Sequence, residues 1–347
     1  MDFSRPDNAR KINRLKVLST LRNRPSSKAG LARLLSINKV SIGEIIDSLL
    51  EEGLIEEAGK ESIPSGRPAM LYAVKGSSGK VFSIELKSRS ISVSVSDTLG
   101  RIMRYERMPR TDSWKEDLND TVSGLRGSDT AKVYGAAVVA SETEELPSFP
   151  DFPTVRIPFS MAEATSEMSR LGGLTSFLFL SWSDSFDACY ITHSGPIHLP
   201  TLPHMRVSKE GLCTCGGTGC LEAAASGSVL KRKCGASSFR ELLSSPQNNA
   251  VIRAAVKTVA YALSEAIQAI GASSVILTGE MSPMDDSFYA FMQEIVSSLL
   301  PPGRKDVVIY GSVSGEKGAR EGAAIAALDM FFYNTELLLK LNAIESL

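Results

Sequence analysis

The sequence has 347 residues, of which 43% are hydrophobic and 22% are charged, with 38 Lys and Arg against 39 Asp and Glu. This composition is typical of a globular protein, and the length exceeds what one hydrophobic core usually organises, so we expect two or three domains. Five cysteines, an odd number that clusters in one region, exclude a secreted disulfide framework.

The chain contains no run of about 18 apolar residues, so we expect no transmembrane helix and no membrane insertion. Its first residues, MDFSRPDNARKINRLK, contain no apolar segment of the kind found in secretory signals. Together with the cysteine usage, these features predict a cytoplasmic protein.

Charge is distributed unevenly along the chain. Residues 1–43 contain ten basic residues against two acids, a local charge of +8, so the other 304 residues sum to −9. A basic segment on an acidic body indicates a polyanion-binding head, although a solvated helix surface would have the same composition. The ten are Arg5, Arg10, Lys11, Arg14, Lys16, Arg22, Arg24, Lys28, Arg33 and Lys39.

The first 75 residues show three helical patterns and then two extended ones. Apolar residues recur at helical spacing over 8–24, over a short segment after Pro25, and over 38–52, where Asn38 is the expected N-cap and Gly53 the expected end. Residues 54–75 have two extended segments around a Pro/Ser/Gly turn, as in a β-hairpin. Three helices followed by a hairpin predict an all-α winged helix-turn-helix with a β-hairpin wing.

In a winged helix-turn-helix the third helix enters the DNA major groove, and the wing approaches the phosphate backbone or the minor groove. An acid near DNA repels phosphate unless it accepts a hydrogen bond from a cytosine amine, which makes Glu44 unusual there. The alternative is a three-helix packing module that does not contact DNA. The residues that we expect to contact DNA are Lys28, Asn38, Lys39, Ser41, Glu44 and Arg67.

The Gly/Ser/Lys-rich segment after Val74 predicts a linker over 76–80, between a DNA-binding domain at 1–75 and a larger domain at 81–347. In the larger domain, strand patterns are followed by helix patterns twice over, which indicates an α/β architecture in two lobes. We expect strands in VFSIELK, SISVSVSD, RIMRYER, KVYGAAVVAS, SFLFLSW, DACYITH, SVILTG and DVVIYG, and helices in MAEATSEMSRLG, NAVIRAAVKTVAYALSEAIQAIGA, DDSFYAFMQEIVSSLL and after GEKGAREGAAIAAL.

Three cysteines lie within eight residues, with a histidine nine positions upstream of the first. His204, Cys213, Cys215 and Cys220 supply one imidazole and three thiolates, which is a full tetrahedral set for Zn²⁺. Because such a set leaves no position for water, the zinc would be structural and would order the loop 204–220. Free buried thiols or a redox pair are the alternatives.

These motifs together resemble the ROK family of repressors, open reading frames and sugar kinases. The resemblance extends through LARLLSINKVSIGEIIDSLLEEGLIEE and GRPAMLYAV in the head, and through HM…CTCGGTGCLEAAASG, VILTGE and GAREGAAIAAL in the body. It implies a two-lobed body of the actin-like, ribonuclease-H-like type. It also implies a homodimer or homotetramer that binds a palindromic double-stranded operator, with repression as the usual outcome.

The resemblance also assigns positions of the family's sugar site to this chain. His204 and Glu222 are kept, while Thr201 stands where the family has a glutamate. Phe159 and Ser160 fall at the family's Asn-Asp pair, whose Asp is the kinase base. A serine without an evident base of its own is poorly suited to deprotonating a sugar hydroxyl, so no catalytic residue is expected, and Glu222, His204 and Ser160 are the candidate effector-binding residues.

The two glycine turns that hold phosphate in the kinases correspond here to IELKSRSIS and SDSFDACYI, which lack glycine. Bulky side chains in such turns prevent a close approach of backbone N–H groups to phosphate. The sequence therefore favours a regulator, not an enzyme. Three functions remain open: a DNA-binding regulator that has lost the kinase site, one that responds to a sugar or to a protein effector, and an active ATP-dependent sugar kinase.

Overall fold

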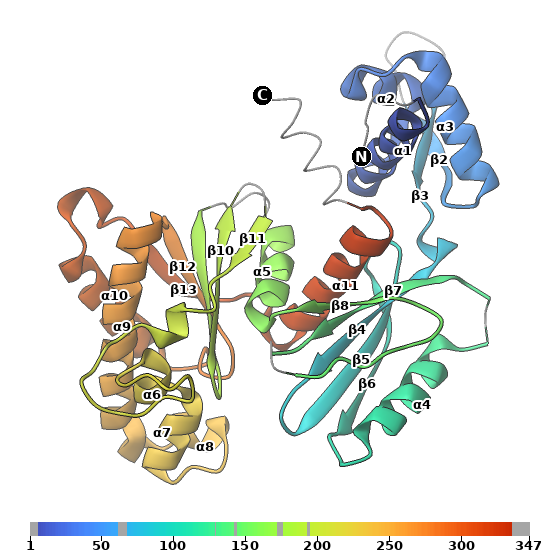
Figure 1. The fold of residues 1–347 in the computed structure, drawn as a ribbon. Helices are drawn as coiled ribbons and strands as arrows, with labels where there is room; N and C mark the ends of the chain where they lie inside the picture. Colours follow the sequence, from blue (N-terminus) through green and yellow to red (C-terminus); the bar gives the residue numbers. More distant parts are fainter. Residues whose placement is uncertain are drawn as a thin grey trace. The chain divides into compact units, whose positions relative to one another are not determined.

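The computed structural model describes residues 6–61, 68–128, 130–141, 144–171, 176–192 and 195–334 (Figure 1). The chain forms two compact units. The first comprises 1–140, 144–156 and 323–347, and the second comprises 141–143 and 157–322. In the described part of the chain, no helix is both long enough and apolar enough to cross a bilayer.

The first unit begins with α1 (Pro6–Asn23), β1 (Ser26–Ser27), α2 (Lys28–Leu35), α3 (Lys39–Glu51), β2 (Ile55–Glu61) and β3 (Ala69–Val74). The three helices and the antiparallel pair β2–β3 lie where the sequence predicts them. β1 was not predicted; it pairs antiparallel with β3, which gives a sheet of order β1-β3-β2. Residues 62–67, between β2 and β3, lie outside the described residues.

Side chains cap the N-termini of α2 and α3, at Asn38 as predicted. The Ser27 hydroxyl accepts a hydrogen bond from the Gly30 N–H at 3.2 Å, and the Asn38 amide oxygen accepts one from the Ser41 N–H at 2.7 Å. Both satisfy N–H groups that have no partner within their helix. Gly53, at a φ of 68°, ends α3 in the left-handed conformation that glycine adopts without strain.

The rest of the first unit is a five-stranded sheet of order β6-β5-β4-β7-β8. Apolar side chains on one face, such as Ile84, Val93 and Val138, pack against α4 in a continuous core. Neither the α4 helix nor the β8 strand was predicted. The elements are β4 (Lys80–Leu86), β5 (Ser90–Asp97), β6 (Ile102–Pro109), α4 (Trp114–Arg126), β7 (Val133–Val139) and β8 (Thr154–Ile157).

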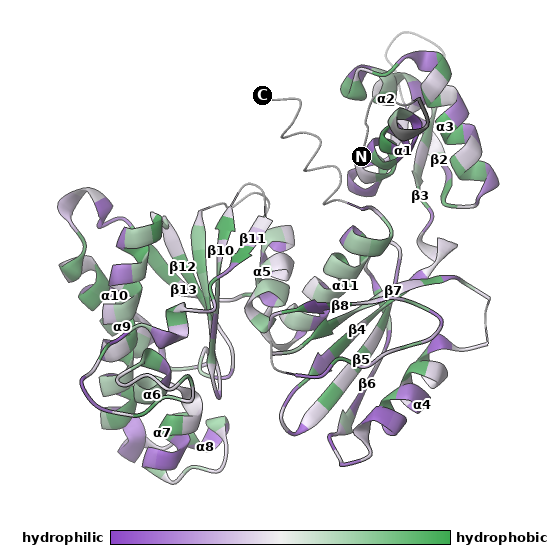
Figure 2. Ribbon diagram, in the orientation of Figure 1, coloured by the Kyte–Doolittle hydropathy of each residue, from purple (hydrophilic) through white to green (hydrophobic). Residues whose placement is uncertain are grey.

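The second unit contains another five-stranded sheet, of order β11-β10-β9-β12-β13. Its strands β9 and β12 are mostly hydrophobic and buried along their whole length, whereas α7 and α8 contain both hydrophilic and hydrophobic residues (Figure 2). Of its elements, β11, α6, α7 and α8 were not predicted. The elements are α5 (Phe159–Arg170), β9 (Phe177–Trp182), β10 (Phe186–Thr192), β11 (Gly195–His198), α6 (Leu221–Ala225), α7 (Gly227–Cys234), α8 (Phe239–Ser244), α9 (Asn249–Ile270), β12 (Ser274–Thr278), α10 (Asp286–Leu299), β13 (Val308–Gly311) and the start of α11 (Gly318–Phe331), whose residues from 323 on belong to the first unit.

The start of α11 lies directly against α5. A Cβ atom built on Gly322 would lie 1.6 Å from the carbonyl oxygen of Ala162, so only glycine allows this approach. The contact is reinforced by Glu321, whose carboxylate accepts hydrogen bonds from the Ser166 hydroxyl and the Arg170 guanidinium. Nearby, the buried carboxylate of Glu167 accepts hydrogen bonds from the loop that follows β13.

We predict that Gly322→Ala destabilises the protein, because its methyl group would overlap a backbone atom that cannot move aside. Overpacking typically costs about 1–3 kcal/mol, and a backbone clash belongs at the upper end. Gly124→Ala is the matched control, since Gly124 is also helical but has no atom within 4 Å of its added Cβ. It should leave stability unchanged or raise it by up to about 1 kcal/mol. Thermal and urea unfolding of both variants measure the difference, and equal melting temperatures would contradict the close approach.

Candidate functional site

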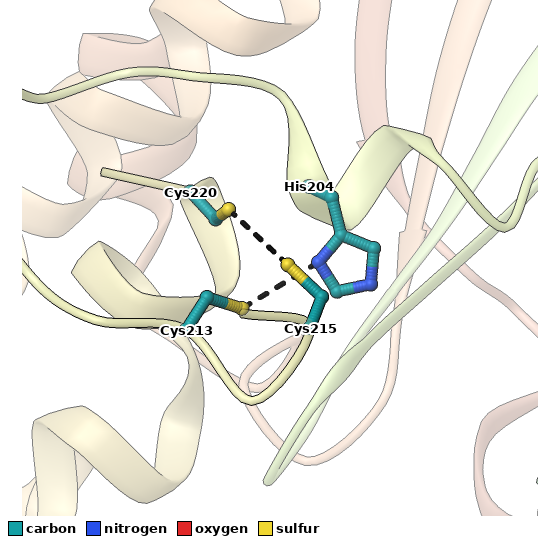
Figure 3. Close-up of side chains that lie close together, drawn as sticks. All are labelled: His204, Cys213, Cys215 and Cys220. Carbon is teal, nitrogen blue, oxygen red and sulfur yellow. Dashed lines mark hydrogen bonds between the residues drawn. The ribbon is translucent and has the colours of Figure 1, made fainter. Parts of the chain in front are cut away.

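Four side chains of the second unit converge in the loop between β11 and α6 (Figure 3). The ligand atoms of His204, Cys213, Cys215 and Cys220 all lie within 4.8 Å of one another. The Sγ atoms of Cys215 and Cys220 are 3.7 Å apart, and Cys213 Sγ is 3.5 Å from His204 Nδ1. For Zn–S bonds of about 2.3 Å and a Zn–N bond of about 2.0–2.1 Å, the corresponding edges of a tetrahedron are about 3.8 and 3.6 Å. The cluster therefore fits a zinc ion.

Backbone turns hold the loop in this shape. The Cys213 N–H donates to the Gly217 carbonyl at 2.8 Å, and the Gly216 N–H donates to the Cys213 carbonyl at 2.9 Å. Gly219 has a φ of 76°, and a Cβ added there would lie 1.9 Å from the Ser208 carbonyl oxygen. Glycine at this position is thus required by both the backbone conformation and the available space.

The electrostatic properties of the three thiols favour a bound cation. Burial raises the pKa of the Cys220 thiol to about 11, and hydrogen bonds with Cys215 and Cys213 act in the same direction. The backbone N–H of Gly217 lowers the pKa of the Cys215 thiol. Neighbouring thiolates repel one another, whereas a bound divalent cation deprotonates coordinating thiols outright. The donor set matches a borderline-soft ion such as Zn²⁺.

Glu222, one of the candidate effector-binding residues, is engaged within the protein. It lies in the first turn of α6, and its Oε2 accepts a hydrogen bond from the Phe186 N–H at 2.8 Å. Burial raises the pKa of this carboxyl, while the hydrogen bonds from Phe186 and Ser226 oppose that rise. Glu222 therefore holds the start of β10 in place.

Ser160, which the family resemblance assigns to the position of the kinase base, lies buried at the start of α5. Its backbone N–H donates to Asp187 Oδ2 at 2.8 Å, and its hydroxyl oxygen has no hydrogen-bond partner among the described residues. Asp187 Oδ1 in turn lies 2.8 Å from His198 Nε2. A carboxylate from β10 thus stabilises the N-terminus of α5, where unpaired N–H groups favour negative charge.

The sequence did not predict this role of Asp187 and His198. The one available signal was an acid in SDSFDACYI, within the turn that contains glycine in the kinases. The pairing itself depends on the β10–β11 hairpin, which places His198 opposite Cys189 and was not expected. Of the candidate effector residues, Glu222 and Ser160 contact consecutive residues of β10, while His204 lies in the cysteine cluster.

The proposed DNA-contacting residues lie at the N-terminal end of α3 and at the start of α2. Asn38, Lys39 and Glu44 are exposed, and Ser41 is half-buried. The opposite side of α3 is its buried stripe of Ile42, Ile45, Ile46 and Leu49. The exposed residues therefore face away from the core of the head.

Part of the basic charge of the head is neutralised internally. Lys28 Nζ pairs with Asp47 at 2.7 Å, and Arg14 pairs with Glu52, whose pKa the Arg14 hydrogen bond lowers. Arg22 pairs with Asp329 of α11 and lies over the ring of Tyr333. Arg67, predicted at the tip of the wing, lies outside the described residues.

The ROK family model matches residues 192–330, a segment that contains the cysteine cluster. Over these residues the chain is similar to the ROK family. A xylose repressor from Caldicellulosiruptor bescii is 30% identical to it over 98 residues, which are 28% of this chain and 25% of the repressor. The chain thus spans about a quarter of the length of the curated relatives that it matches.

Solved structures give the fold of the ROK body. A ROK family transcriptional regulator, described as a homolog of the E. coli MLC protein, superimposes with a TM-score of 0.76 at 16% identity, over 97% of this chain and 99% of that one. A ROK hexokinase from Thermus thermophilus gives 0.57 at 21% identity, over 71% of this chain and 97% of that one. The body therefore has the two-lobed, actin-like ROK fold, as the sequence predicts.

We predict that the purified protein binds about one zinc ion per chain and that Cys220→Ser abolishes most of this binding, because a tetrahedral site then lacks one ligand. EDTA should lower the melting temperature of the wild type but not that of the variant. Elemental analysis and thermal unfolding make the measurement. Cys234→Ser is the control, since Cys234 is outside the cluster and half-buried. Zinc retained fully in Cys220→Ser would remove Cys220 from the ligand set.

Proposed function

We propose that this chain is a sequence-specific DNA-binding transcriptional repressor. Residues 1–75 are its winged helix-turn-helix domain, 76–80 its linker and 81–347 its ROK-type body. The observation that supports this most directly is the arrangement of α2 and α3. The two helices are joined by a short turn, each is capped by its own side chain, and the N-terminal end of α3 exposes Asn38, Lys39 and Glu44. The likeness to a ROK transcriptional regulator over 97% of the chain adds support.

The predicted residues fall into two groups, one that binds backbone phosphates and one that contacts base edges. Lys39 and Lys28 supply positive charge for backbone phosphates, although Lys28 must exchange its Asp47 partner for a phosphate. Asn38, Ser41 and Glu44 lie along the first turns of α3, from which base edges in the major groove are contacted. Arg67 of the wing contributes a phosphate or minor-groove contact.

We further propose that the body has lost kinase activity. Ser160 lacks a carboxylate to accept a proton from a sugar hydroxyl, and the helix N-terminus beside it is already bound to Asp187. Asp187 therefore occupies the N-terminus of α5, where a catalytic acid or an anionic ligand would otherwise be stabilised. The body serves as a scaffold for assembly, with a structural Zn²⁺ on His204, Cys213, Cys215 and Cys220.

Two candidate effector-binding residues are engaged within the protein. Glu222 and Ser160 both make internal hydrogen bonds to the start of β10, which favours absent or altered sugar recognition over binding of an ordinary hexose. Each lost hydrogen-bonding partner costs a polar ligand roughly 1–3 kcal/mol. A protein effector is then the alternative to a sugar. We propose a homodimer or homotetramer, as the family resemblance implies, and its two symmetric heads would bind a palindromic operator.

The DNA-binding proposal is tested by selecting duplexes from a randomised library with the purified protein. We predict that one palindromic sequence is enriched and that Lys39→Ala weakens binding to it several-fold. The salt dependence of log K against log [salt] should become less steep by about 1, because one phosphate contact is lost. Lys305→Ala removes an exposed lysine of the second unit and is the control. Failure to enrich any duplex would contradict the proposed function.

The loss of the kinase site is tested by thermal shift against hexoses, amino sugars, their phosphates and Mg-ATP. We predict an unchanged melting temperature across the panel. A ligand at a hundredfold excess over its Kd would stabilise the protein by about 2.7 kcal/mol, which such an assay detects. A selective rise with one sugar would instead establish a sugar-responsive regulator, and phosphorylation of that sugar would establish a kinase.

A further inference from the structure

The exposed face of α3 contains an apolar side chain at its N-terminal end. Val40 is 72% exposed, more than any other large hydrophobic residue described in the head. It stands opposite the buried stripe of Ile42, Ile45, Ile46 and Leu49, so it makes no contribution to the core of the head. An apolar side chain held in water at the start of a helix gains free energy when a partner surface covers it.

Glu44 lies one helical turn after Val40 on the same face and is also exposed. Its carboxylate has no ion pair or hydrogen bond in the described part of the chain. By contrast, two other acids of this helix region are neutralised, since Asp47 pairs with Lys28 and Glu52 pairs with Arg14. The N-terminal half of the face that approaches DNA in the proposed function therefore presents one methyl-rich side chain and one unneutralised carboxylate.

The side chains of Val40 and Glu44 fit different base edges in the major groove. The C5-methyl group of thymine is the apolar feature of the groove, and the N4 amine of cytosine is the donor that a carboxylate accepts from. Against phosphate alone, Glu44 would be repulsive, so a carboxylate is tolerated there only if it contacts such a donor.

On the basis of the proposed DNA-binding function, we infer that Val40 and Glu44 determine base specificity. Val40 packs against a thymine methyl group, and Glu44 accepts a hydrogen bond from a cytosine amine. Four residues of helix advance about 6 Å along the axis. At about 3.4 Å per base step, the thymine and the cytosine lie about two base pairs apart in each half-site.

The experiment starts from the duplex selected by the wild-type chain. Binding is measured to that duplex, to a duplex with deoxyuridine in place of each thymine in turn, and to duplexes in which each cytosine–guanine pair is replaced. At one thymine, removal of the methyl group should weaken wild-type binding about fourfold, the equivalent of one buried methyl group. Val40→Ala should bind the thymine and deoxyuridine duplexes equally well.

Glu44→Gln tests the second residue. It should reduce discrimination at one cytosine about tenfold, within the range of specific base contacts, while raising affinity for unrelated DNA because a repulsive charge is removed. Glu51→Gln is the matched control: Glu51 is exposed two turns further along the same helix. It should change affinity for all duplexes alike, without changing base preference.

The outcomes separate the two levels of the proposal. If no duplex is enriched, the proposed function itself fails. If a duplex is enriched but Val40→Ala keeps the full preference for thymine over deoxyuridine, Val40 does not contact the methyl group and the inference is overturned for that residue. Unchanged cytosine discrimination in Glu44→Gln overturns it for Glu44. Circular dichroism of each variant confirms that the helices are intact.

Discussion

The packing of α3 against the head decides what the protein presents to a partner. Ile42, Ile45, Ile46 and Leu49 form one buried stripe at helical spacing, and burying them fixes the rotation of the helix. Because the rotation of α3 about its axis is fixed in this way, Val40 and Glu44 lie on the side away from the stripe and face outward. The Asn38 cap fixes where the helix begins, so the cap and the buried stripe together set the position of these two side chains on the surface of the head.

In the second unit, several carboxylates accept hydrogen bonds from the protein's own backbone. Asp187 holds the N-terminus of α5, Glu222 holds the Phe186 N–H, and Glu167 binds the loop after β13. A buried or half-buried carboxylate stabilises a structure only when hydrogen bonds satisfy it, and removing one partner leaves a costly unpaired group. Such an arrangement favours one fixed conformation over a site that must exchange ligands.

The sequence was sufficient for features that depend on local pattern and much less so for features that depend on long-range pairing. Helical spacing, Asn38 and Gly53 correctly predicted α3 and its ends, and four soft ligands predicted the cluster at His204. The contact between Asp187 and Ser160 joins residues 27 apart and depends on how β10 packs against α5. The amphipathic α4 was missed although Leu118, Val122 and Leu125 have helical spacing, because its many polar residues concealed that stripe.

In the proposed function, the internal ion pairs of the head limit how strongly its positive charge attracts DNA. A surface ion pair contributes little to stability, so Lys28 can leave Asp47 for a phosphate at small cost, but Asp47 then becomes an unneutralised acid on the same helix as Glu44. Net attraction to non-specific DNA is thereby reduced, since phosphates attract Lys39 and repel these acids. A head of this kind depends more on base contacts for its affinity, and that dependence raises the ratio of specific to non-specific binding on which a regulator relies.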